Sequence, residues 1–180
     1  MKEFFKHNRG AAFCALAVII VLSVFLGTLR SVNGLEKKVG KFYSDSTSKY
    51  VSVSSDLGKL RSYATDLFAV ADAHGCADKD FSDALRNLSD VISSPFGQEN
   101  AVKDLVTAAN TAYRHLAAAD GVSDAEMTTA KLNFYDIDAS FKRLINNSDY
   151  NKAAQKYNSA VNSFPASIIV VGKSDAAVFN

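Results

Sequence analysis

The sequence has few of the residues that build loops and covalent crosslinks, and no excess of one charge. Two prolines and nine glycines in 180 residues disfavour a loop-rich sandwich or barrel. Two cysteines, Cys14 and Cys76, are too few for a disulfide framework or a four-ligand zinc site. The 20 basic and 19 acidic residues give a formal charge of +1. This balance lacks the basic excess typical of nucleic-acid-binding proteins, so we expect no nucleic-acid partner.

The sequence also contains none of the common catalytic motifs. No HExxH, CxxC or GxSxG motif and no glycine-rich phosphate loop occurs. His74 at a helix end and His115 on a helix surface are expected to be structural. Asp78, Asp80 and Asp83 lack the glycine and the closing glutamate of a calcium loop and better suit a helix N-terminus. We therefore expect no enzymatic activity, no catalytic residue, no metal site and no cofactor.

The longest hydrophobic run covers residues 11–29 and contains no charged residue. As a helix rising ~1.5 Å per residue it spans roughly 28 Å, close to the ~30 Å hydrocarbon core of a bilayer. A cleaved signal peptide is the competing interpretation, but its apolar region has only about 7–15 residues and ends in a small-x-small site. This run is longer and ends at Thr28, Leu29 and Arg30. We predict a short basic tail at 1–10 and an uncleaved transmembrane anchor at 11–29.

The distribution of charge around the span gives the expected orientation. Basic residues lie on both sides of the span, so the positive-inside rule does not decide the orientation directly: Lys2, Lys6 and Arg9 precede it, and Arg30, Lys37, Lys38 and Lys41 follow it. Four of the 20 basic residues and one of the 19 acidic residues precede Ser31, which leaves 16 basic and 18 acidic residues after it. A short basic tail before a mildly acidic body favours a single-pass cell-membrane protein whose body lies on the outer side, periplasmic or extracellular.

Apolar residues at steps of three and four predict four helices between residues 30 and 165. The first runs from Glu36 to His74, and the second begins after Asp78 and ends before Pro95. The third covers about residues 98–119. The fourth begins after a capping box at Ser123 and continues to residue 164, with a kink or local unwinding at a one-residue slip of the stripe near residue 146.

Two long and two short helices of this kind define the expected fold class. We predict an all-α protein in which a transmembrane helix precedes an antiparallel up-and-down bundle with coiled-coil-like stripes, over residues 30–165. Three rods with a broken middle rod are the alternative packing. An extended tail at 166–180 is expected to dock on the bundle, with Phe164 as the last core residue and Ile168–Val171 turning alternate side chains inward. A free hook for a partner is the rival interpretation of this tail.

The C-terminal part of the sequence resembles the C-terminal signature of the LemA family over residues 134–180. The residues that carry the resemblance are two Tyr-Asn pairs seven residues apart, an arginine before them, and a Phe-Pro pair followed by apolar residues: Arg143, Tyr150, Asn151, Tyr157, Asn158, Phe164, Pro165, Ile168, Ile169, Gly172 and Phe179. Only Asp56-Leu57 matches the motif that the family carries in its first long helix, so the chain is identified as a divergent member. The resemblance implies a bacterial, membrane-anchored helical bundle with no established biochemical activity.

Residues seven apart on a helix lie on one face, so Tyr150 and Tyr157 share the apolar stripe and Asn151 and Asn158 lie beside them. One interpretation is a polar network that fixes the register of the helices. The other is a site for a ligand or partner lined by these amides and phenols. The candidate interaction or register network is Arg143, Tyr150, Asn151, Tyr157, Asn158, Phe164 and Pro165.

Two functions fit these patterns. The first is a membrane-anchored, non-catalytic scaffold or interaction module, with the lipid bilayer and a protein partner or a second copy of the chain as its partners. The second is a ligand-sensing bundle on a membrane anchor, in which a small molecule or peptide shifts the helices.

Overall fold

The computed structural model describes residues 9–180, with only the backbone of Arg9. Within this range the chain forms seven helices and no strand, which confirms the all-α class. The helices are α2 (Arg9–Ser44), α3 (Val53–Ala73), α4 (Lys79–Val91), α5 (Glu99–Ala118), α6 (Asp124–Asn146), α7 (Ser148–Asn162) and α8 (Ala166–Ile169). The basic tail predicted at 1–10 lies, up to residue 8, outside the described residues, and residues 9 and 10 already belong to α2.

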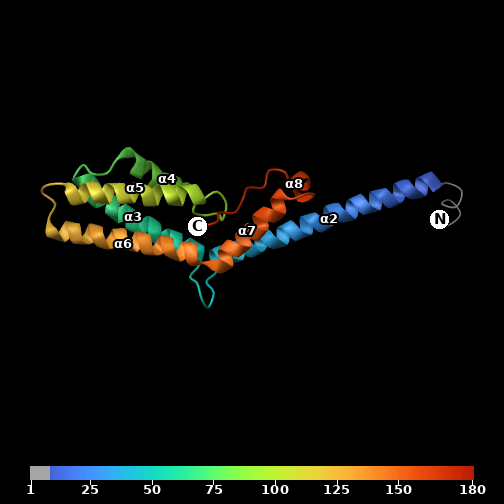
Figure 1. Ribbon diagram of the computed structural model, residues 1–180, viewed down its shortest axis with the longest axis horizontal. Helices are drawn as coiled ribbons and strands as arrows, with labels where there is room; N and C mark the ends of the chain where they lie inside the picture. Colours follow the sequence, from blue (N-terminus) through green and yellow to red (C-terminus); the bar gives the residue numbers. More distant parts are fainter. Residues whose placement is uncertain (1–8) are drawn as a thin grey trace.

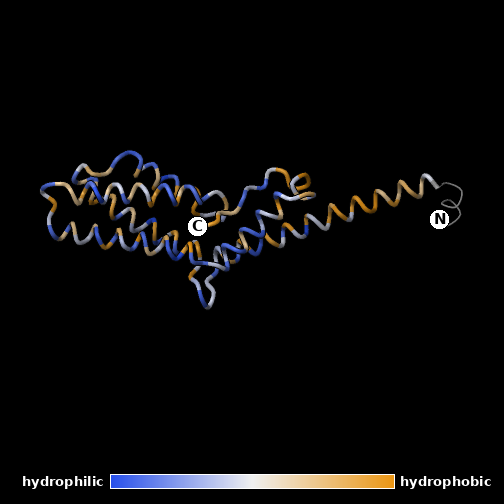
Figure 2. The backbone as a smooth tube through the Cα atoms, viewed as in Figure 1, coloured by the Kyte–Doolittle hydropathy of each residue, from blue (hydrophilic) through white to orange (hydrophobic). Residues whose placement is uncertain are grey.

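Helix α2 has 36 residues, and its C-terminal part packs against α7 and α8 (Figure 1). It is long and apolar enough over Gly10–Ser44 to cross a membrane. None of the residues in its most apolar stretch is buried in the protein. The hydrophobic part projects away from the other helices, as Figure 2 shows. The body covers α2 from the end of the predicted span onward, where Leu29 is partly covered and Val32 is buried. The same helix therefore passes from the predicted span into the body without a break.

The single helix predicted over Glu36–His74 is wrong, because a loop separates α2 from α3 between residues 45 and 52. Short polar side chains hold this loop. The hydroxyl of Thr47 accepts from the N–H groups of Lys49 and Tyr50, at 3.3 and 3.0 Å, and the hydroxyl of Ser46 accepts from Ser52 N–H at 3.1 Å. Serine and threonine compete with helical hydrogen bonds in this way, so a stripe of apolar residues did not suffice to continue the helix.

Helices α3 to α6 pack together on the side away from the start of α2, and we call them the distal group (Figure 1). Their ends follow local signals. Asp78 caps α4 by accepting from Phe81 N–H, and Ser123 and Glu126 form the predicted capping box of α6. Gly75 and Gly121 have φ values of 66° and 83° just after α3 and α5, a conformation that glycine adopts without strain. The predicted boundaries of α4 and α5 and the predicted start of α6 are close to the observed ones.

The kink or local unwinding predicted near residue 146 is a full break in the structure, so the single helix predicted to continue to residue 164 is wrong and two helices take its place. Asn147 is both the C-cap of α6 and the N-cap of α7, and its side chain accepts from Tyr150 N–H at 3.2 Å. After this residue the chain leaves the distal group, and α7 packs against α2 instead. Helix α8 contacts both α2 and α7, so these three helices form a second group, which we call the proximal group.

The predicted extended tail after Pro165 is wrong in its backbone and in the side chains that it buries. Residues Ala166–Ile169 form α8, and Phe164 is 82% exposed where a last core residue was expected. Ile168 and Val171 are 68% and 81% exposed. The buried positions are instead Ala166 and Val170, because residues four apart share one face of a helical turn. The rest of the tail does dock, through Ala176, Ala177 and Phe179, which are all buried.

Candidate functional site

The four Tyr-Asn residues of α7 surround the C-terminal segment, residues 174–180, which passes between α7 and the loop that joins α4 to α5. Tyr150 and Tyr157 are almost fully buried, and Asn151 is buried beside them. Ala153 and Ala154 lie between the two pairs and are also buried. Their small side chains leave room for another segment to approach the helix closely. The four Tyr-Asn residues of the predicted network therefore form a cluster that contacts the C-terminal segment.

Asn151 connects three segments with one side-chain amide. Its Nδ2 donates to the carbonyl oxygens of Leu144 and Ile145, both at 3.0 Å. Its Oδ1 accepts from Phe179 N–H, also at 3.0 Å. The two carbonyls belong to the last turn of α6, where helical partners run out. Asn151 thus satisfies the end of α6 and holds the C-terminal segment at the same time.

Asn158 binds the backbone of Ala176 as a neighbouring strand would. Its Nδ2 donates to the Ala176 carbonyl at 2.9 Å, and its Oδ1 accepts from Ala176 N–H at 2.8 Å. On its other side the segment makes an isolated antiparallel bridge between Ala176 and Phe96, and Ala177 N–H donates to Pro95 O at 3.0 Å. The extended segment is therefore hydrogen-bonded along both edges.

The tyrosine hydroxyls complete the cluster. Tyr150 donates to Pro95 O at 3.3 Å, and Tyr157 lies 3.5 Å from Ser174 O. Tyr43 of α2 donates to Ile92 O and accepts from Gln98 Nε2 at 2.8 Å. Burial raises the pKa of Tyr43 to about 12 and raises the pKa values of Tyr150 and Tyr157 as well. These phenols therefore stay protonated near neutral pH and act as hydrogen-bond donors.

The other predicted site residues lie elsewhere. Arg143 donates from Nε to Asp56 Oδ1 and from a terminal nitrogen to Ser140 Oγ, both at 2.8 Å. This pair joins α6 to α3 inside the distal group. Phe164 and Pro165 occupy the turn between α7 and α8. The structure therefore divides the predicted set into an α7 cluster, an interhelical ion pair and an exposed turn.

Several residues of the cluster were not predicted as site residues. Tyr43 and Gln98 are buried and bonded to each other, and Gln98 Oε1 has no hydrogen-bond partner among the described residues. Asn162 donates to Asp175 Oδ1 at 2.9 Å and extends the series of asparagines on α7. Asn162 could have been predicted from the sequence, because it lies four residues after Asn158 and therefore on the same face of the helix. Nothing local marks Gln98, which lies beside Tyr43 only because the chain folds back.

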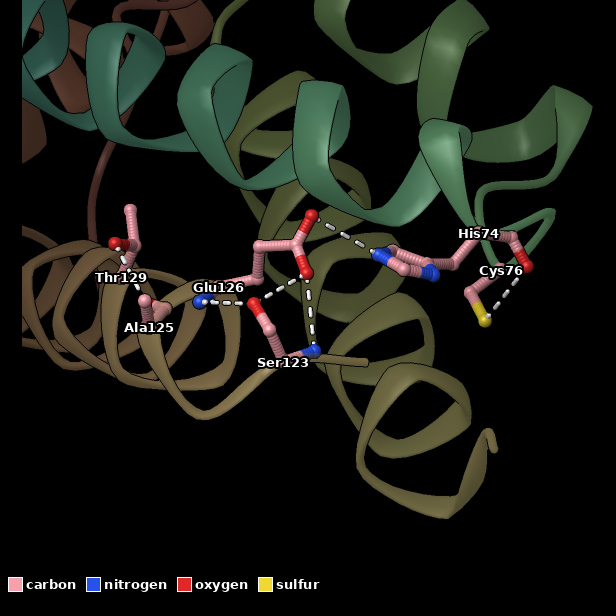
Figure 3. A network of polar contacts seen from close by, with 6 residues as sticks. All are labelled: His74, Cys76, Ser123, Ala125, Glu126 and Thr129. Carbon is pink, nitrogen blue, oxygen red and sulfur yellow. Dashed lines mark hydrogen bonds and ion pairs between the residues drawn. The ribbon is translucent and has the colours of Figure 1, made fainter. Parts of the chain in front are cut away.

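A second polar network lies where α3 ends and α6 begins (Figure 3). Glu126 Oε2 accepts from the hydroxyl of Ser123 at 2.6 Å and from its N–H at 3.0 Å. Glu126 Oε1 lies 3.3 Å from Nε2 of His74, an ion-pair distance. The Ser123 hydrogen bonds, followed by the His74 contact, lower the pKa of Glu126 to about 2.

This network does not have the connectivity of a nucleophilic triad. The carboxylate lies between the serine and the histidine, whereas a triad needs the serine bonded to the histidine. The thiol of Cys76 points to the backbone carbonyl of His74, at 3.5 Å, rather than to the ring (Figure 3). The arrangement is a helix cap extended by a histidine from the neighbouring helix end.

Two open cavities of about 420 Å³ each occur on the described surface. The first lies between α4 and α5, with Asp78, Asp80, Asp83 and Asp104 in its lining. The second is bordered by Tyr157, Phe96 and the ion pair of Glu36 with Lys173. Among residues 9–180, no three His, Cys, Asp or Glu side chains are grouped so that they could hold a metal ion.

These observations define a class: an all-helical protein with one helix near its N-terminus that is long and apolar enough to span a membrane. No protein-family model, no curated protein and no solved structure matches the chain.

Proposed function

We propose that the chain is a single-pass membrane protein whose helical body acts as a non-catalytic scaffold or interaction module. One observation carries the proposal: α2 continues from the apolar segment directly into the body, where Val32, Val39 and Tyr43 are buried. A body attached in this way has a fixed orientation and distance relative to the bilayer, unlike a body on a flexible linker. We include in the proposal the up-and-down arrangement of the distal group and the location of the body on the outer side of the cell membrane.

The state of the α7 cluster favours a scaffold over a sensor. The amides of Asn151 and Asn158 use both their donors and their acceptors on backbone groups of the same chain. Tyr157 borders the second of the two cavities, and Tyr150, Asn151 and Asn158 line neither of them. A packed and satisfied network holds a structure in place and leaves little capacity to bind a further molecule.

The proposed relationship to the LemA family rests on the same residues. Its Tyr-Asn pairs are the side chains that hold the C-terminal segment, and its arginine forms the ion pair with Asp56. We propose the relationship on these residues alone.

A protein partner is expected at the outer face of α6. Leu132 and Tyr135 are 59% and 55% exposed and lie three residues apart on that helix. A photo-crosslinking residue at position 132 or 135 should give a discrete adduct in intact membranes. The same residue at Lys59, an exposed position on α3, is the control and should not. Absence of any adduct at 132 and 135, with the protein folded and in the membrane, would contradict the interaction-module proposal.

The second candidate, ligand sensing, is favoured by the cavity beside Tyr157. Its lining combines a phenol with the charged side chains of Glu36 and Lys173, which suits a small polar molecule. If this cavity is a sensing site, the small-molecule fraction of a cell extract should raise the melting temperature of the wild type. Lys173→Met should abolish the rise. An unchanged wild-type melt would argue against this candidate.

A further inference from the structure

The turn between α7 and α8 carries a cluster of exposed apolar side chains. Outside the apolar part of α2, six large apolar residues are exposed among those described: Val51, Leu132, Tyr135, Phe164, Ile168 and Val171. Three of the six lie within eight consecutive residues, and they are 68–82% exposed. Figure 2 shows this turn and α8 as a hydrophobic region beside α2. Single exposed apolar residues are ordinary, but a cluster of this kind marks a surface that contacts something apolar.

The register of α7 against α2 places this turn level with the end of the apolar span. The rings of Tyr150 and Tyr43 lie 6.3 Å apart, and the two helices run in opposite directions (Figure 1). Asn162 lies twelve residues beyond Tyr150, or ~18 Å along α7. The same ~18 Å back along α2 from Tyr43 reaches Ser31. The end of α7 is therefore beside the residue that follows Arg30.

Contacts with α2 hold α8 at this level. Helix α8 packs against α2, whose buried positions begin at Val32, and Leu29 is partly covered. The ion pair of Lys173 with Glu36 fixes the chain just after α8. Val32 and Glu36 lie ~4.5 and ~10 Å beyond Leu29 along the helix. The polar layer of a bilayer is about 5–8 Å thick on each side of its hydrocarbon core. The apolar turn thus lies within or just above this layer when residues 11–29 span the core.

The charges on the adjoining part of α2 suit an anionic lipid surface. Between residues 30 and 41 the helix carries Arg30, Lys37, Lys38 and Lys41, which are all exposed. Glu36 is the one acidic residue in this stretch, and it is paired with Lys173. Exposed basic residues next to an apolar face are the usual composition of a segment that lies in a membrane interface.

We infer that the α7–α8 turn inserts Phe164, Ile168 and Val171 into the interface of the same bilayer that α2 crosses. The body then contacts the membrane at two places, the span and this turn, which prevents it from tilting about α2. The inference rests on the proposed function, since it requires α2 to span the membrane.

Tryptophan fluorescence tests the inference because the sequence contains no tryptophan. Phe13→Trp reports the span, Ile168→Trp the turn, and Leu132→Trp the distal group, and all three positions are exposed. Each full-length variant is reconstituted in vesicles of phosphatidylcholine and phosphatidylglycerol with and without brominated acyl chains. We expect bromolipid to quench Phe13→Trp strongly, to reduce Ile168→Trp emission by roughly half, as for a residue at the interface, and to leave Leu132→Trp unchanged. Val171→Trp serves as a second reporter if Ile168→Trp folds poorly.

The pattern of quenching distinguishes failure of the proposed membrane contact at the turn from failure of the proposed transmembrane anchor. Quenching of Phe13→Trp without quenching at 168 or 171 would overturn the membrane contact of the turn and leave the anchor intact. A blue-shifted but unquenched signal at 168 would show that a second copy of the chain covers the turn, and would also overturn it. No quenching of Phe13→Trp would overturn the proposed function together with the inference. Quenching of all three variants would show a body that lies flat on the vesicle, which contradicts contact through the turn alone.

Discussion

At the scale of single residues, side-chain amides supply the hydrogen bonds that a sheet would otherwise give to the C-terminal segment. An extended segment exposes alternating N–H and C=O groups, and leaving them unpaired when buried is costly. Asn158 pairs both groups of Ala176, while Asn151 pairs the N–H of Phe179. These asparagines therefore stabilise a segment that has no strand beside it on the α7 side.

Asn158→Ala should lower the free energy of unfolding by about 1–3 kcal/mol, the usual cost of leaving partly buried partners unpaired. Hydrogen exchange should also accelerate at Ala176. Asn162→Ala is the control, because its bond to Asp175 is exposed, and it should change stability by no more than about 0.5 kcal/mol. Equal losses for the two variants in chemical denaturation would contradict the role of Asn158.

Arg143→Ala should destabilise the protein by about 2 kcal/mol, because it leaves the buried carboxylate of Asp56 without its counter-charge. This value is below the range for fully buried pairs, since the side chain of Arg143 is 44% exposed. The double variant Asp56→Ala/Arg143→Ala should recover part of the loss in a denaturant titration. The neighbouring Lys142→Ala removes an exposed pair with Asp138 and should cost no more than about 0.5 kcal/mol.

At the scale of helices, caps fix the ends of the elements, and contacts between those ends join one element to another. The capping box of α6 is reinforced by His74, which belongs to the end of α3. Near the C-terminus, the terminal segment covers the start of α7. The ring centroids of Phe179 and Tyr150 are 5.9 Å apart. The ends of helices are thus the places where separate elements are joined.

Glu126→Gln should change the pH dependence of stability in the acid range. The pKa of Glu126 is lowered from 4.5 to about 2, so its carboxylate contributes stability that is fully present above pH 4.5. The contribution is lost as the pH falls from 4.5 toward 2. The difference in melting temperature between wild type and Glu126→Gln should therefore shrink as the pH falls below 4.5, and the titration of Glu126 itself adds no change above that pH. A difference that does not vary with pH would contradict the assigned pKa.

Phe179→Ala should cost about 3 kcal/mol, at the lower end for a buried phenylalanine because the terminal segment can move aside to fill the space. Ile168→Ala is the matched control in the same tail, since its side chain is 68% exposed, and should stay within about 0.5 kcal/mol in soluble or detergent-solubilised protein. Thermal melts compare the two. A larger effect at Ile168 would mean that the tail docks through its apolar run instead.

At the scale of the whole molecule, the proposed membrane span and the start of the body belong to one helix, α2. Helices α7 and α8 pack on the part of α2 that follows the proposed span, and the distal group extends beyond it (Figure 1). Helices α7 and α8 therefore have a fixed position relative to the proposed span.

The protein should remain in the membrane pellet after washes with high salt and with carbonate, because a charge-free span is not held by electrostatics. Leu22→Arg together with Val18→Arg places two charges within the span and should release the protein to the soluble fraction. Extraction of the wild type by salt alone would contradict the anchor. A mature chain that starts after Arg30 would show a cleaved signal instead.

The sequence by itself determined the features that depend on neighbouring residues. Hydropathy is a local property, so the length and position of the apolar segment could be predicted. Caps are also local, and Asp78, Ser123 and Glu126 lie where their sequence pattern placed them. The slip in the stripe near residue 146 located the irregularity at Asn147, although it predicted a kink and the structure has a helix end there. The Tyr-Asn pairs were recognised as a cluster because two turns of one helix bring them to one face.

Only the tertiary structure decided which helices pack their apolar stripes against each other. The stripes of α6 and α7 look alike in the sequence, yet α6 joins α3 and α7 joins α2. The buried positions of the tail likewise depend on the fold, because Ala166 and Val170 are covered where α8 packs against α2 and α7. The partner of Asn158 is eighteen residues away and that of Arg143 is eighty-seven. Such pairs form only when the helices are packed together, because the energy of a side-chain contact depends on which residue of a distant segment lies against that side chain.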